Sequence, residues 1–347
     1  MLSRQEECAG RNMDIHLNER ARLRALLSAV VWFLFLTPGI SAAEKIRVAF
    51  VSPTPVFAPA WIAKETGIFA RHGLDADVIL LTGSPRLVQT LIAGDLDFAV
   101  VGLTAVMRAR MQGAELAVLA TTTNVSVMKL LVNRQSGIRR LEDLKGKVMG
   151  VSQYGSEADA FARIVVNKAG LKPDKDVAII QMGGHPQVAA ALVAGKIETG
   201  VLGGLALLTA KKSGAVVLAD GTKLNTVSMA GTLAVPRRTI QRSRDSVMRF
   251  MRAFVEAFHY LKTNREGSIP ILQKYMGGIN TEQARFVYDE YVDLYEELPV
   301  PREKGFQAVL DNETDPKAKN FKPADFVDLS FLNEIDRSGQ VEKIYKK

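Results

Sequence analysis

The chain of 347 residues has little of what metal or thiolate chemistry requires: one cysteine, Cys8, and four histidines. No cysteine follows residue 43, so disulfides, thiolate metal sites and cysteine nucleophiles are excluded from the rest of the chain. The histidines there (His72, His185 and His259) have no partner at metal-ligand spacing. Serine-hydrolase and P-loop motifs are also missing. We therefore expect no catalytic site, no metal and no cofactor.

The chain also lacks a concentrated charge. Its 45 basic and 37 acidic residues give a net charge of +8, which is spread along the sequence. No basic stripe interleaves with aromatic residues, so we expect no nucleic-acid partner. The composition, 47% hydrophobic and 24% charged, is ordinary for a globular protein, and we expect a monomer.

Long hydrophobic runs are missing as well, and the run at Ala25–Leu36 has only 12 residues. At ~1.5 Å per residue this run is too short to span about 30 Å of hydrocarbon. Arginines at positions 20, 22 and 24 precede it, and Ser41-Ala42-Ala43 follows. This pattern predicts a cleavable signal peptide over residues 1–43. An uncleaved membrane anchor is the alternative, and Met13 is an alternative start.

What the sequence does contain is a repeat. Residues 83–114 and 184–215 align without a gap at an offset of 101, and 11 of the 32 positions are identical. Alternating strand and helix patterns surround both copies and predict a parallel sheet in each. Two copies of one α/β unit predict two lobes with a cleft between them. The period is too long for a solenoid.

The repeat suggests domain bounds. We predict lobe one at residues 44–134 and 236–347, lobe two at 135–235, and two crossing strands as the hinge. A helix is expected at about Pro59–Arg71, and a closing helix within Phe326–Tyr345. Apolar residues at helical spacing between Val247 and Leu261 predict a core helix rather than a ligand surface.

Ligands bind beyond the carboxyl ends of strands in open parallel sheets, which selects loops rich in Gly, Ser and Thr. Several of these loops lead into helix N-termini. Trp61 could be core or cleft wall, Glu157 could serve a helix dipole or a ligand, and His185 could be structural. The candidate ligand contacts are Ser52, Thr54, Phe57, Trp61, Thr82, Gly83, Ser84, Gly102, Thr104, Ser152, Tyr154, Gly155, Ser156, Glu157, Gly203 and Gly204.

Several segments carry a family resemblance, among them "PAWIAKETGIFARHGLDADVILLTG" (59–83), "LIAGDLDFAVVG" (91–102), "LEDLKGKVMGVSQYGS" (141–156) and "LVAGKIETGVLG" (192–203). They resemble the solute-binding proteins of ABC importers, in the branch that contains sulfonate, taurine, nitrate and thiamine-pyrimidine-precursor receptors. The resemblance implies the type II periplasmic-binding-protein fold, with two α/β lobes on a two-strand hinge. The cleft loops of that family fall on the candidate contacts above.

The resemblance also implies a periplasmic protein that captures a small-molecule solute between its lobes and delivers it to a permease and its ATPase in the inner membrane. The candidate loops contain no Arg or Lys, which makes a neutral or aromatic, partly polar solute plausible beside an anion. Two alternatives stay open. One is an enzyme on the same fold, such as a pyrimidine-precursor synthase or a menaquinone-pathway enzyme. The other is a ligand-sensing partner of a membrane receptor.

Overall fold

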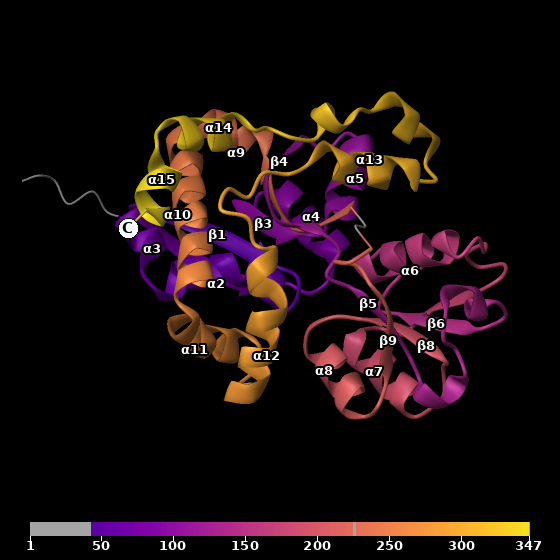
Figure 1. The fold of residues 1–347 in the computed structure, drawn as a ribbon. Coiled ribbons are helices and arrows are strands. Elements are labelled where there is room, and N and C mark those ends of the chain that lie inside the picture. The colour runs from indigo at the N-terminus through magenta and orange to yellow at the C-terminus, as the bar shows by residue number, and fades with distance from the viewer. Residues whose placement is uncertain (1–42, 225–226, 347) are drawn as a thin grey trace, which may run out of the picture. The chain divides into compact units, whose positions relative to one another are not determined.

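The computed structural model describes residues 43–224 and 227–346, which contain two five-stranded sheets. Figure 1 shows the strands of these sheets with the helices around them. The first sheet has the strand order β2-β1-β3-β10-β4 and the second has β7-β6-β8-β5-β9. We call the parts built on these sheets lobe one and lobe two. The strands are β1 Glu44–Phe50, β2 Leu74–Leu80, β3 Phe98–Val101, β4 Leu116–Val125, β5 Lys129–Val132, β6 Val148–Val151, β7 Ala178–Gln181, β8 Thr199–Leu202, β9 Val216–Asp220 and β10 Val227–Pro236.

The two sheets are mixed and follow the same plan. In each, the three strands at one end of the order are parallel, and the fourth runs antiparallel to both of its neighbours. Strand β3 and strand β8 lie 101 residues apart at equivalent places, as the repeat predicts. The predicted class, α/β with two parallel-rich lobes, is confirmed.

The fourth strand of each sheet corrects the predicted bounds. Strand β5 belongs to lobe two, although the bound at 134/135 assigns it to lobe one. Strand β10 belongs to lobe one, although the bound at 235/236 assigns it to lobe two. The chain therefore crosses just after β4 and just before β10. Both strands have buried sequences that fit either sheet, so periodicity alone does not assign them.

Helices cover the sheets, and the last third of the chain is mainly helical. The predicted core residues between Val247 and Leu261 lie on α10 and are at most 1% exposed. Phe250 of that helix stacks on Phe98 of β3. The helices are α2 Ala58–Glu65, α3 Ile68–Arg71, α4 Ser84–Ala93, α5 Leu103–Met111, α6 Glu157–Lys168, α7 His185–Val193, α8 Gly204–Lys212, α9 Arg237–Arg242, α10 Arg244–Thr263, α11 Arg265–Tyr275, α12 Thr281–Tyr291, α13 Glu303–Asp311, α14 Ser330–Arg337 and α15 Gln340–Tyr345.

Two predicted single helices are each broken in two by a glycine. The helix expected at 59–71 is α2 followed by α3, and Gly67 between them has φ 69°. The closing helix is α14 followed by α15, and Gly339 between them has φ 68°. Glycine adopts this left-handed conformation without the Cβ clash that other residues suffer, so both glycines permit a turn of the chain between helices.

No helix within residues 43–224 and 227–346 combines the length and the apolar character needed to cross a membrane. The predicted signal peptide lies outside the described residues, apart from Ala43 at its end.

Candidate functional site

A cavity of about 1370 Å³ lies where the carboxyl ends of the strands of both sheets meet. From lobe one it is lined by the residues that follow β1, β2 and β3, and from lobe two by those that follow β6, β7 and β8. All of the candidate ligand contacts except Trp61 and Gly204 line it. The loops predicted from the strand ends therefore lie around one cavity, because parallel strands bring their carboxyl ends to one edge of each sheet.

Trp61 and Gly204 lie elsewhere. The Trp61 ring is fully buried and stacks on Tyr275 with 5.1 Å between ring centroids, so it belongs to the core of lobe one. Gly204 is the first residue of α8 and lines a separate small recess beside Lys129. The sequence left Trp61 open between core and wall, because an apolar helix turn fits both.

The hydroxyl groups of Tyr154 and Ser156, which the sequence predicts as ligand contacts, form hydrogen bonds with the backbone instead. The Tyr154 hydroxyl donates to the carbonyl of Ile179 at 3.1 Å, while the residue as a whole is 54% exposed. Ser156 donates to the Gln153 carbonyl at 2.6 Å and accepts from the Asp159 amide, as the N-cap of α6. Tyr154 thus offers its ring to the cavity, and Ser156 acts mainly on the helix.

Glu157 is the distinctive group of the cavity. It is the first residue of α6, and its Oε1 accepts a hydrogen bond from the Ser126 hydroxyl at 3.2 Å. The Val127 amide faces the same carboxyl. Burial raises the pKa of Glu157 to about 7, because these two hydrogen bonds only partly replace the lost water. Among the described residues, no cation lies within ion-pair distance of Glu157.

Ser126 and Val127 belong to the segment that crosses from β4 to β5. Glu157 therefore links the cavity-lining start of α6 in lobe two to one of the two crossing segments. The sequence left Glu157 open between a partner of the α6 dipole and a ligand contact, and its place at the start of α6 beside the cavity allows both. The sequence places Ser126, 31 residues away, in another loop at a strand end, but it does not indicate that the Ser126 hydroxyl meets Glu157.

The cavity also contains two arginines that sequence reasoning missed, Arg108 of α5 and Arg163 of α6. Arg108 binds Glu313 in a forked pair, with Nε to Oε2 at 2.6 Å and Nη2 to Oε1 at 3.4 Å. Arg163 pairs with Asp159 at 3.1 Å and with Asp174 at 2.6 Å. Both arginines project from inside helices, whereas the strand-end rule searches only loops.

The C-terminal third supplies further lining residues that the sequence did not indicate, including Tyr291 at the end of α12. Burial raises the pKa of the Tyr291 hydroxyl, and the nearby Glu157 raises it further, so this phenol is neutral. A Cβ on Gly203 would lie 3.7 Å from the Tyr291 oxygen and 2.7 Å from the Met128 methyl group. The glycine at position 203 therefore allows Met128 and Tyr291 to approach the strand end.

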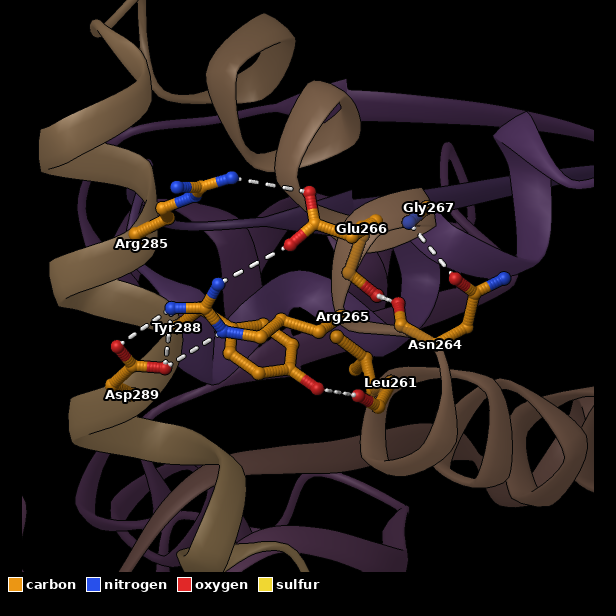
Figure 2. A network of polar contacts seen from close by, with 9 residues as sticks. Leu261, Asn264, Arg265, Glu266, Gly267, Arg285, Tyr288 and Asp289 are labelled. Atoms are coloured by element: carbon orange, nitrogen blue, oxygen red, sulfur yellow. Dashed lines mark hydrogen bonds and ion pairs between the residues drawn. The ribbon is translucent and has the colours of Figure 1, made fainter.

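Figure 2 shows how α12 is held in place. Arg265 of α11 pairs with Asp289 at 2.9 Å, Arg285 pairs with Glu266 at 3.3 Å, and the Tyr288 hydroxyl donates to the Leu261 carbonyl at 2.5 Å. On its other side, α12 reaches lobe two, where Glu290 pairs with Lys129 of β5. Tyr291 is thus positioned by contacts on both lobes.

His185 lines the cavity at the start of α7. Burial lowers the pKa of its imidazole, although a hydrogen bond to the backbone of Val201 opposes the shift. Its Nδ1 is buried, with no hydrogen-bond partner among the described residues. A neutral ring at this position is consistent with a structural role and with a wall of the cavity, the two alternatives that the sequence left open.

Two mixed sheets with the same strand order, and a cavity at the strand ends of both, define an α/β protein of the periplasmic-binding-protein fold. Residues 54–267 match the model of the NMT1/THI5-like family, and the chain belongs to this family.

Known proteins resemble this chain in sequence and in fold. A relative from Brucella abortus (strain 2308), named as a binding protein, is 29% identical over 258 residues, which cover 73% of this chain and 78% of the relative. The periplasmic aliphatic sulphonate binding protein SsuA from Escherichia coli has a TM-score of 0.65 at 20% identity, over 80% of this chain and 86% of SsuA. The periplasmic nitrate-binding protein NrtA from Synechocystis PCC 6803 has a TM-score of 0.70 at 13% identity, over 86% of this chain and 90% of NrtA.

Proposed function

We propose that this protein is an extracytoplasmic solute receptor, which binds a small molecule in the cavity and delivers it to an ABC importer permease and its ATPase. The observation that carries the proposal is the cavity of about 1370 Å³, which is lined from both sheets and is large enough for a small molecule. The family and the neighbours agree with it, since one neighbour of the same fold, from Staphylococcus aureus, is described as the ligand binding component of an ABC-type import system.

The mechanism follows from the two crossing segments. A solute that touches the loops of both lobes binds best when the lobes are close together, so it shifts an open–closed equilibrium by its differential affinity for the two states. The permease would then recognise the closed form. In this scheme the protein makes no covalent bond to the solute, and none of the residues that line the cavity acts as a catalyst.

Native mass spectrometry of protein purified from its natural compartment tests the proposal. We expect a co-purified small molecule that is lost on unfolding in urea and refolding. Adding the same molecule back at about 100 times its Kd should stabilise the refolded protein by about 2.7 kcal/mol, which a thermal-shift assay detects.

A cavity-filling variant is the matched control. Gly102 lines the cavity and has φ −68° and ψ 133°, which any residue adopts. A Cβ there would lie 3.5 Å from the Ser84 hydroxyl, an ordinary contact. Gly102→Leu should fold and bind no solute. Recovery of no small molecule from the unaltered protein, together with no thermal shift from fractionated cell extract, would contradict the receptor function.

A further inference from the structure

The charges around the cavity carry information on the class of solute. Glu157 is a carboxyl group without a cation partner among the described residues, and two donors, the Ser126 hydroxyl and the Val127 amide, approach it. A carboxylate offers about four lone-pair positions. Glu157 can therefore accept further hydrogen bonds from a molecule in the cavity, which it lines.

The cations of the cavity are engaged elsewhere. The Glu313 side chain is only 4% exposed, and both of its carboxylate oxygens accept hydrogen bonds from Arg108. Arg163 is bound by the carboxylates of Asp159 and Asp174. An anionic solute would have to compete with these carboxylates for the arginines, and it would be repelled by Glu157 when that group is ionised.

The remaining wall suits an apolar or aromatic body. Phe57, Met229 and Leu205 line the cavity, and the exposed ring of Tyr154 lies at its edge. Aromatic faces pack well on flat rings. The cavity thus combines apolar lining residues with one carboxyl acceptor, and both of its arginines are paired with carboxylates.

We infer that the cavity selects a solute that has an aromatic or alkyl body and a hydrogen-bond-donating nitrogen group, neutral or cationic, which Glu157 binds, and that it discriminates against sulfonates, nitrate and other anions. This inference rests on the proposed receptor function and narrows its substrate class. It separates the protein from neighbours of the same fold that are named for sulfonate and nitrate. The negative charge of Glu157 discriminates between solutes. It attracts hydrogen-bond donors and repels anions at the same time.

A series of four benzene derivatives that differ only in the head group tests the inference: benzamidine, benzamide, benzoate and benzenesulfonate. Binding to the refolded, solute-free protein is measured by calorimetry at pH 8. We expect benzamidine to bind about tenfold or more tighter than benzenesulfonate, as for a hydrogen bond to a charged group, with benzamide between them. Glu157→Gln should reduce this ratio by about tenfold or more.

The control variant is Glu303→Gln, which removes an exposed carboxyl on α13 and should leave the ratio unchanged. A wild-type preference for benzenesulfonate, or a ratio that Glu157→Gln does not alter, would overturn the inference while leaving the receptor function in place. Binding of none of the four compounds would also overturn it. The receptor function fails separately, through the absence of any co-purified or extract-derived solute.

Discussion

The partly buried carboxyl of Glu157 makes the stability of this protein depend on pH in a way that one substitution should remove. The native pKa is raised to about 7 from 4.5. At about 1.4 kcal/mol per unit, this shift corresponds to roughly 3 kcal/mol. The N-terminus of α6 favours the ionised form of Glu157 by ~0.3–1 kcal/mol, which offsets part of this penalty. We therefore expect a net penalty of about 2–3 kcal/mol when Glu157 is fully ionised.

The direction of the pH effect follows from the difference between the pKa values of Glu157 in the unfolded and the native state. Below the unfolded pKa both states hold the proton, so no penalty exists. As pH rises from about 4.5 to about 7, the unfolded state loses its proton first, and the native state loses stability relative to it. Above about 7 the penalty is complete. Glu157→Gln cannot ionise and keeps an amide oxygen that can accept from Ser126. It should therefore match the wild type near pH 4.5 and be about 2–3 kcal/mol more stable at pH 8.

Urea denaturation at pH 5 and pH 8 measures the difference, with protein that has been unfolded and refolded to remove any bound solute. Glu303→Gln serves as the control for loss of one exposed negative charge. A Glu157→Gln variant that is less stable than the wild type at pH 8, or that differs from it equally at both pH values, would refute the reasoning.

Three further substitutions test packing and hydrogen bonding within the two lobes. Gly231 has φ 67°, and a Cβ there would lie 2.6 Å from Val56 Cγ1, so Gly231→Ala should cost about 2–4 kcal/mol in urea denaturation. Gly214→Ala, with φ 91° and open space around it, should cost only about 1–2 kcal/mol, and equal losses would contradict the packing argument. Tyr295→Phe removes a buried hydrogen bond of 2.7 Å to the Pro55 carbonyl and should cost about 1–2 kcal/mol, whereas an unchanged urea midpoint would contradict this role.

Much of the fold could be predicted because its signals are local. Gly94 ends α4 in the left-handed conformation, and Ser156 caps α6; glycine and serine are residue types that favour these two positions. The repeat at an offset of 101 correctly placed β8 and α8 as counterparts of β3 and α5. Strand ends, caps and turns depend on residues a few positions apart, so a single sequence contains the information.

The candidate site could be predicted only in part. The loops at the strand ends were found, because a general rule of parallel sheets points to them. Arg108 and Tyr291 were missed, since both project from helices and the rule selects loops. Trp61 was offered as a contact but is core, because an apolar helix turn has the same pattern in either place.

The sequence by itself determined that the chain forms two α/β units of similar architecture, where several of their helices begin and end, and which strand-end loops line the cavity. Only the tertiary structure decided which sheet contains β5 and β10, that Glu157 accepts a hydrogen bond from Ser126, and that Glu313, 205 residues away in the sequence, pairs with Arg108. The physical reason is that burial and ion pairing depend on which distant segments meet. A local pattern of residues specifies a helix or a strand. The net charge that the cavity wall presents depends on which side chains pair with one another after folding.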